Sequence, residues 1–460
     1  MKKILSFIAA LAMVLSLSAC LAGGGREETV VAIPNELPNE PIEIVMWHAF
    51  GQANQDLLQE MFDSFRLIYP QVTIIQVSQG GYDGLRESTM QGIVSGITPV
   101  IVMGYPDHFV EYLNGNALVP LDEYINHPEH GIDLEDFVQG FLEENRQYLD
   151  GKQYSLPFAK STEMVVYNKD WFDAQGITLS RTVPLTWAEL EVLAETMVGS
   201  GPNQCDFLFN ADSAANFFIN STRQWDAGYT NNEGQILIDN PQTREMLSYF
   251  EDLFERDVVA FPIEWEENYG SIPFKQGKVC MSQGSTAGTR HNVPGATDAF
   301  TNIGIIPVIQ KDLNNQHVMQ QGPNVAIISD ADDNQRLAAW LLLKHMTSTE
   351  NTADFAMATG YVPVRISGFE TPEYQAFLQL VDRHEAGETL TPQERIRLPF
   401  SMAANVAFAQ VNAYGFDAAF VGRVTSSGAR REAGLAFEAV YAGTRTVEEA
   451  INRMLNQLGQ

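Results

Sequence analysis

The chain has 460 residues and a formal charge of −30, with 58 Asp and Glu against 28 Lys and Arg. This acidity excludes nucleic acid as a partner, because binding to a phosphate backbone needs a basic surface. The length suffices for two domains, and the 45% hydrophobic and 10% aromatic fractions are typical of a protein with a well-packed core.

The first 20 residues have the layout of an export signal. A short basic start precedes an apolar stretch over residues 4–17, which is too short to span a membrane as a helix. Cys20 follows directly after two small residues. This pattern resembles the lipobox of bacterial lipoproteins. It implies that residues 1–19 are a signal peptide and that Cys20 receives a diacylglycerol and an amide-linked acyl chain such as palmitate. An ordinary signal peptide with an incidental cysteine is the alternative.

Residues 20–41 would then be the lipidated cysteine and a flexible tether. Gly, Pro and Glu dominate this segment and no hydrophobic period is sustained. About 20 extended residues reach roughly 70 Å. Since no second apolar run of membrane-spanning length follows, we expect an extracytoplasmic body in the cell envelope, held at the membrane by its lipid anchor.

From residue 42 the chain alternates strand and helix patterns. Apolar and β-branched runs predict strands over 42–47, 72–77 and 99–103. Apolar residues at helical spacing predict helices over 54–65 and 82–94. This order predicts an open α/β sheet.

The same pattern continues for most of the chain and gives way to a helical end. Further elements are predicted at 164–167, 187–197, 277–281, 303–308 and 324–328, and residues 333–460 are mostly helical. Cys205 and Cys280 follow Cys20 as the only other cysteines. Nothing local brings these two together, so we expect two buried free thiols, with a disulfide as the alternative in an oxidising compartment.

Several motifs stand at characteristic positions along the body. The most specific is Leu-Pro-Phe within 156–162 followed by Tyr-Asn-Lys-Asp at 167–170. The others lie at 44–48, 80–83, 277–281, 322–324 and 359–364. Together they resemble the extracellular solute-binding proteins of ABC importers, family 1, a carbohydrate type that includes the glycerol-3-phosphate-binding proteins.

The resemblance implies a type II periplasmic-binding-protein fold, in which two α/β lobes close about a hinge on a ligand in the cleft. The N-terminal lobe would comprise 42–155 plus 302–350, and the C-terminal lobe 156–301 plus 351–460. Ligands of open α/β sheets sit beyond the carboxyl ends of strands, which agrees with such a cleft. The resemblance also implies a monomer that passes a sugar or polyol to an ABC permease, without cofactor or metal.

Four ligand-binding residues are implied by the glycerol-3-phosphate-binding relatives. They are Tyr82, Ser161, Gly322 and Tyr361. The relatives carry a glutamate after a tyrosine at the end of the third strand, whereas here Tyr105 is followed by proline and then Asp107. We therefore take Asp107 as the candidate carboxylate. Arg290 and Arg423 are the nearest options for the relatives' phosphate-contacting arginine.

The residue types themselves suggest further contacts, because sugar sites combine aromatic faces with short polar groups. His48 ends the first strand, Thr162 stands beside Ser161, and Trp225 lies in a polar stretch that would suit a stacking platform. Ser285 follows a strand at a Gly-rich turn whose free N–H groups would hold a hydroxyl or an anion. The alternatives are a core Trp225 and a purely structural turn at Ser285.

No motif of the common hydrolases, metalloproteases or nucleotide-binding enzymes is found. The lipoprotein signal, the α/β pattern and the segments that resemble solute-binding proteins make a non-catalytic receptor for a carbohydrate or polyol the leading hypothesis. A binding protein for glycerol-3-phosphate or a glycerophosphodiester is the second hypothesis, and it predicts an arginine or a helix N-terminus at the cleft. A secreted glycoside hydrolase is the third, with acidic pairs such as those at 143–144 and 266–267 as candidate carboxylates.

Overall fold

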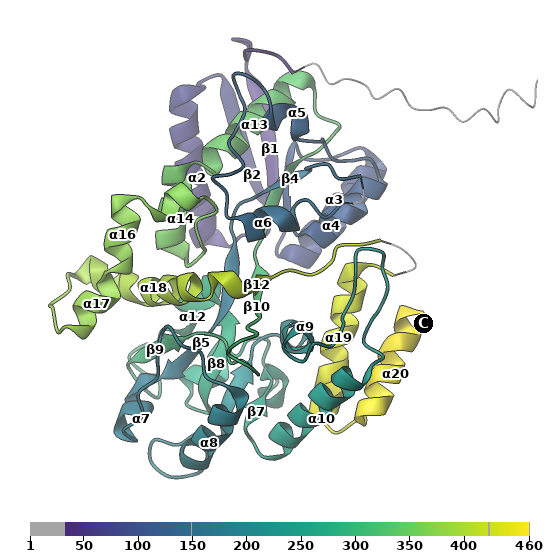
Figure 1. Cartoon of the computed structure of the whole chain (residues 1–460). Helices are drawn as coiled ribbons and strands as arrows, with labels where there is room; N and C mark the ends of the chain where they lie inside the picture. The colour runs from purple at the N-terminus through teal and green to yellow at the C-terminus, as the bar shows by residue number, and fades with distance from the viewer. Residues whose placement is uncertain (1–32, 149, 422–423, 460) are drawn as a thin grey trace, which may run out of the picture. The chain divides into compact units, whose positions relative to one another are not determined.

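The computed structural model describes residues 33–148, 150–421 and 424–459. The chain divides into two units, 1–34 and 35–460, and the helices and strands that the structure describes belong to the second (Figure 1). The predicted signal peptide, Cys20 and most of the tether lie outside the described residues. Within the described part, no helix combines the length and the apolar character needed to cross a membrane.

The first sheet has five strands in the order β2-β1-β3-β11-β4. Their bounds are Val72–Ser78, Ile42–His48, Ile101–Gly104, Asn324–Ile327 and Ser155–Pro157. β1 is parallel to β2 and β3, while β11 runs antiparallel to β3 and β4. Parallel neighbours need crossover helices, and α2 (Gln52–Ile68) and α3 (Tyr82–Ser95) provide them. The predicted open α/β sheet is confirmed.

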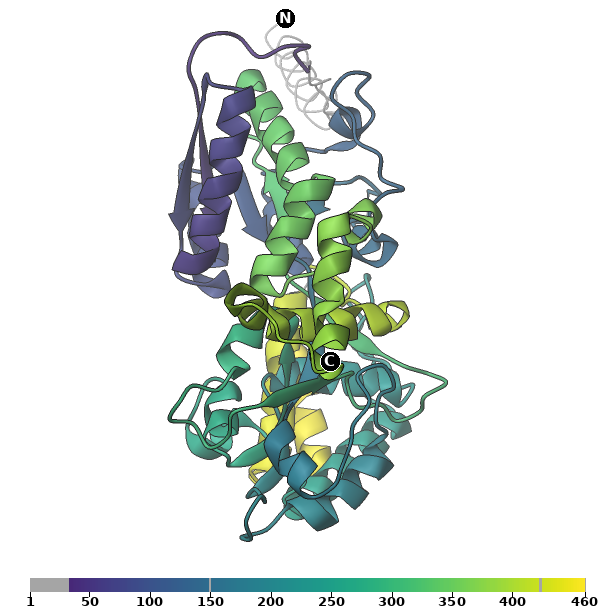
Figure 2. The same ribbon diagram turned by 90° about the vertical axis from the view of Figure 1, so that its left-hand side faces the viewer.

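Helices cover both faces of this sheet. α2 lies beside α13 (Asp333–Met346), which packs on β1 and β11 (Figure 2). The apolar stripe of α2 is buried, as its spacing predicted. α3 packs on β3 and on α4 (Pro106–Asn114). Each of α3 and α4 begins just after a parallel strand, so both start at the carboxyl edge of the sheet.

The second sheet has seven strands, with β12-β10-β5-β8-β6-β7 in order and β9 beside β5. Their bounds are Tyr414–Gly415, Val318–Gln321, Ser161–Asn168, Val279–Ser285, Phe207–Ala211, Val259–Ala260 and Ile303–Ile306. β5 is buried along its whole length, as in a sheet covered on both faces. Residues 302–321, predicted with the N-terminal lobe, contribute β9 and β10 to this second sheet through pairing with β5. The remaining lobe boundaries stay a prediction.

The second sheet packs on a helical layer with an aromatic core. α9 (Ala214–Gln224) and α19 (Ser426–Tyr441) lie against each other, and α10 and α20 pack beside them (Figure 1). α8 (Trp187–Met197) begins with a Thr186–Glu189 capping box. The other helices are α5 (Asp122–Ile125), α6 (Gln139–Glu144), α7 (Lys169–Ala174), α10 (Pro241–Glu255), α11 (Ser271–Lys275), α12 (Thr289–Asn292), α14 (Thr349–Thr359), α15 (Ile366–Phe369), α16 (Pro372–Leu378), α17 (Leu380–Glu385), α18 (Pro392–Ala409), α20 (Val447–Leu458) and the 3₁₀ turns η1 (Pro262–Trp265), η2 (Thr286–Gly288) and η3 (Val411–Ala413).

Two short segments carry the chain from one sheet to the other. Residues 158–160 join β4 to β5, and residues 322–323 join β10 to β11. Lys160 ties the two together, since its Nζ donates to the carbonyl oxygen of Gly322 at 2.7 Å and to the carboxylate of Glu144. Lys160 is fully buried. The crossings therefore form one interconnected hinge region.

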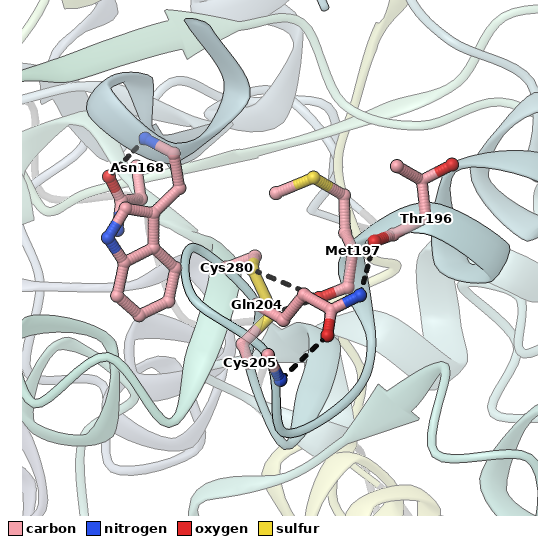
Figure 3. Close-up of a disulfide and its surroundings, with 8 residues drawn as sticks. Asn168, Thr196, Met197, Gln204, Cys205 and Cys280 are labelled. Carbon is pink, nitrogen blue, oxygen red and sulfur yellow. Dashed lines mark hydrogen bonds between the residues drawn. A yellow bond between two sulfur atoms is a disulfide. The ribbon is translucent and has the colours of Figure 1, made fainter. Parts of the chain in front are cut away.

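Cys205 and Cys280 form a disulfide, with Cα atoms 5.7 Å apart (Figure 3). The prediction of two free thiols is wrong. Cys280 lies on β8, and Cys205 lies two residues before the start of β6, which is the parallel neighbour of β8. Gln204 holds the loop between α8 and β6 in place. Its side-chain NH₂ group donates to the carbonyl oxygen of Thr196, and its side-chain oxygen accepts from the N–H of Gly201 (Figure 3). Strand pairing, which is not visible in the local sequence, brings the cysteines together.

Candidate functional site

A cavity of about 720 Å³ lies between the elements that surround the first sheet and those that surround the second. α3, α4 and α6 line it from the side of the first sheet. α9, β10, α19 and the residues just before α19 line it from the side of the second sheet. Its volume falls within the range of small-molecule sites, and elements of both lobes contribute to it.

Three helices begin at this cavity. Tyr82 opens α3 after Gly81, which has a φ of 139° that a side chain would strain. Pro106 opens α4, where its missing N–H costs nothing. Thr425 caps α19 by accepting from the N–H of Gly428 at 3.0 Å. Helix N-termini carry partial positive charge and unpaired N–H groups, so the cavity favours electron-rich oxygen atoms.

Arginines from both sides add full positive charge. Arg430 of α19 lines the cavity and donates to Oδ2 of Asp417 at 3.0 Å. Asp417 also accepts from Arg223 at 3.2 Å. Arg86 of α3 lines the other side and pairs with Glu111 at 3.0 Å. The carboxylates hold both guanidinium groups in place before any ligand arrives.

Asp107, the candidate carboxylate from the sequence, lines the cavity. Its Oδ2 accepts a hydrogen bond from the hydroxyl of Ser427 at 2.6 Å. Asp107 belongs to α4 and Ser427 to α19, so this bond joins the two lobes across the cavity. Ser427 has no counterpart among the predicted site residues.

Aromatic side chains form one wall. Tyr82 and Tyr105 both line the cavity, with ring centroids 4.8 Å apart in an edge-to-face arrangement. Tyr361 is buried behind them and stacks on Phe355 at 5.6 Å. Burial raises the pKa of Tyr361 to about 12 and raises the pKa of Tyr82 well above its usual value. The tyrosine hydroxyls therefore stay neutral and can both donate and accept.

Four predicted residues lie at the crossings and do not line the cavity. The Ser285 hydroxyl donates to that of Ser161 at 3.1 Å, and the Thr162 hydroxyl donates to the carbonyl oxygen of Met319 at 3.2 Å. Gly322 has a φ of +95°, and a Cβ there would lie 2.0 Å from the carbonyl oxygen of Ala159. In this conformation they hold the two crossings together, and ligand contact by these four residues stays a prediction.

His48 and Trp225 also lie away from the cavity. His48 is fully buried, its Nδ1 accepts from the N–H of Phe50 at 3.1 Å, and burial lowers its pKa. Trp225 belongs to the core of the second lobe, 4% exposed, with the Lys311 ammonium 4.7 Å from its ring centroid. Its face is therefore covered, which corrects the interpretation of Trp225 as a stacking platform.

Several lining residues were not predicted from the sequence. They are Arg86, Tyr105, Gln320, Gln321, Ser427 and Arg430. The Thr-Ser-Ser-Gly run at 425–428 was a usable signal, since it is an N-cap followed by small polar residues ahead of two arginines. Of the arginines proposed instead, Arg290 donates to Asn54 and is not among the residues that line this cavity, and Arg423 lies outside the described residues.

The family model described as "Bacterial extracellular solute-binding protein" matches residues 60–379. The chain belongs to this family. The sn-glycerol-3-phosphate-binding periplasmic protein UgpB of Salmonella typhimurium is 20% identical over 403 residues, covering 84% of this chain and 86% of that protein. A maltotriose-binding protein of Pyrococcus abyssi is 23% identical over 339 residues, covering 72% and 68%.

Solved structures share the fold. UgpB from Mycobacterium tuberculosis in complex with glycerophosphocholine has a TM-score of 0.73 at 19% identity, covering 91% of this chain and 97% of that chain. The GacH receptor of Streptomyces glaucescens has a TM-score of 0.68 at 16% identity, covering 90% and 98%. This solute-binding protein therefore has the predicted periplasmic-binding-protein fold of two lobes, and its family is one of binding proteins of ABC importers.

Proposed function

We propose that this solute-binding protein captures a carbohydrate or polyol in the cavity between its lobes and delivers it to an ABC import permease as a monomer without catalytic activity. The observation that carries the proposal is the cavity of about 720 Å³ lined from both lobes. Tyr82 and Tyr105 offer aromatic surface for C–H groups, while Asp107, Gln320 and Gln321 offer partners for hydroxyls. Closure of two lobes on a solute uses such a shared site.

One observation favours the second candidate function, which is binding of glycerol-3-phosphate or a glycerophosphodiester. The N-terminus of α19 and the guanidinium group of Arg430 meet at the same side of the cavity. Helix N–H groups together with an arginine are a recurrent phosphate-binding arrangement. A relative named for sn-glycerol-3-phosphate and a structural neighbour solved with glycerophosphocholine support this candidate.

A thermal-denaturation panel tests the proposal. We expect at least one of maltose, maltotriose, glycerol, sn-glycerol-3-phosphate and glycerophosphocholine to raise the melting temperature. A ligand at 100 times its dissociation constant stabilises the native state by about 2.7 kcal/mol, which is readily measured. Folded protein that responds to no sugar, polyol or glycerophosphate would overturn the proposal, and turnover of chromogenic glycosides would support a hydrolase instead.

Arg430→Gln separates the two ligand classes. We expect it to weaken glycerophosphocholine binding by about 10- to 100-fold, because a hydrogen bond to a charged group contributes about 1.5–3 kcal/mol, while maltotriose binding changes little. Asp417 retains Arg223 as a partner, so the fold should persist. Arg256→Gln is the matched control, since the Arg256 side chain is 44% exposed and does not line the cavity. Equal effects of the two substitutions, measured by titration calorimetry, would exclude Arg430 as the phosphate-binding group.

We further propose that Cys20 anchors the protein in the membrane through acyl chains, as its lipobox pattern indicates. Two or more buried chains are needed for stable anchoring. Wild-type protein should partition with the detergent phase of a cell extract and incorporate labelled palmitate, and Cys20→Ser should do neither. Detergent partitioning of Cys20→Ser equal to that of wild type would rule the anchor out.

A further inference from the structure

Glu163 is a buried carboxylate near the start of β5, 3% exposed, and contacts Gln321 of the cavity lining. Three side-chain amides donate to it. Asn216 reaches Oε1 at 2.7 Å, Gln283 reaches Oε2 at 2.7 Å, and Gln321 reaches Oε1 at 3.3 Å. Within the described ranges no lysine, arginine or histidine forms an ion pair with Glu163. A buried charge is usually paired, so a cage of amides calls for another explanation.

The cage has a consequence for the cavity, because Gln321 lines it. An ionised carboxylate can only accept hydrogen bonds, so Gln321 must turn its NH₂ group to Glu163, and its carbonyl oxygen then points away from Glu163. The NH₂ group of the neighbouring Gln320 is also held by a hydrogen bond. Its NH₂ group donates to the carbonyl oxygen of Gly140 at 3.0 Å, and its own amide oxygen is buried without a partner in the described structure. At the floor of the cavity, where both glutamines lie, Gln321 is therefore the one whose amide oxygen is left for a ligand.

We propose that Glu163 is a positioning residue that sets the hydrogen-bonding polarity of this floor, fixing Gln321 so that the site selects a ligand with a hydroxyl or ammonium donor there. This inference rests on the proposed function of the cavity. On the same lobe, the α19 N-terminus and Arg430 favour oxygen atoms that accept. The two groups of contacts together orient a ligand that has an anionic or acceptor-rich part and a hydroxyl-rich or cationic part.

The protonation state of Glu163 controls the arrangement. Burial raises the pKa of Glu163 to about 6, while the amides of Asn216 and Gln283 and the charge of Arg430 oppose the rise and Asp212 adds to it. Asp212 is half-buried, its partial burial raises its pKa, and it accepts from the N–H of Gly270. Above pH 6 Glu163 is ionised and only accepts. Below pH 6 its carboxyl proton can be donated, which allows an amide to reverse.

A titration of the ligand-free protein tests the inference directly. In ¹H–¹⁵N spectra, the side-chain NH₂ resonances of Gln321 should shift with a midpoint near pH 6 and should stay constant in Glu163→Gln. Asp212→Asn is the matched control and should keep the titration of Gln321. Resonances of Gln321 that do not respond to pH in the wild-type protein, or that respond equally in Glu163→Gln, would overturn the proposal.

Binding measurements complete the test. Glycerophosphocholine and maltotriose are suitable probes because neither titrates between pH 5 and 7.5, unlike a phosphate monoester with its second pKa near 6. Whichever binds should bind about tenfold more weakly at pH 5, the effect expected for one hydrogen bond. Glu163→Gln should remove this pH dependence. In a Gln321→Ala background it should add nothing further, whereas a merely structural role would give additive losses.

Failure of the proposed function gives a different result. If neither probe binds to folded protein, the ligand class is wrong, while the titration of Gln321 still decides the role of Glu163. If a probe binds with the same pH profile in wild type and Glu163→Gln, the solute-binding function stands and the positioning role falls.

Discussion

Lys160→Met should lower the free energy of unfolding by about 3–5 kcal/mol. Lys160 is fully buried and donates to the carboxylate of Glu144, which is 5% exposed, and to the carbonyl oxygen of Gly322. Removing one member of a buried ion pair leaves the other charge unpaired in a low-dielectric surrounding. Burial accordingly disfavours both charges, lowering the pKa of Lys160 and raising that of Glu144.

The double substitution distinguishes a lost ion pair from lost packing. Glu144→Gln keeps a hydrogen-bond acceptor, so it should cost less than Lys160→Met, and the two together should cost clearly less than the sum of the single losses. Urea denaturation of the ligand-free protein measures all three. Strict additivity, or a loss below about 1 kcal/mol for Lys160→Met, would show that the pair does not stabilise the hinge.

Removal of the disulfide should cost about 4 kcal/mol. Cys205 and Cys280 are 75 residues apart, and cross-linking a loop of this length removes about 4 kcal/mol of chain entropy from the unfolded state. Both half-cystines are buried in the core of the second lobe, and replacing both, as Cys205→Ala with Cys280→Ala, leaves no free thiol in this core. We expect a lower denaturation midpoint for this variant than for the oxidised wild type.

Ligand binding provides the control for the variant that lacks the disulfide. Neither cysteine lines the cavity, so the variant should respond to the same members of the ligand panel as the wild type under conditions where both are folded. Wild type unfolded in the presence of a reductant should match the variant in stability. A variant as stable as the oxidised wild type would show that the disulfide contributes nothing to the equilibrium.

Part of the site was predictable because it depends on local sequence. Tyr82 and Asp107 lie in the first turns of α3 and α4, helices that follow parallel strands. The carboxyl edge of a parallel sheet places such residues at a ligand site. Both line the cavity. The turn at Gly81 also carries a sequence signal, because its positive φ suits glycine.

Other site residues depend on long-range contacts and left no clear local signal. Glu163 follows two polar residues that the sequence marked as ligand contacts, yet only the amides of Asn216, Gln283 and Gln321 show what its carboxylate does. Trp225 looked exposed in a polar stretch and is instead buried under Lys311. In each case the deciding partner lies far away in the chain.

The sequence by itself determined the alternation of strands and helices and the family to which the chain belongs. Those features are local, since side-chain periodicity and short motifs are read within a few residues. Only the tertiary structure decided that Cys205 and Cys280 pair, that β9 and β10 join β5, and that Arg430 and Gln321 line the cavity. Strand order and helix packing bring those residues together, and neither is encoded at any single position of the chain.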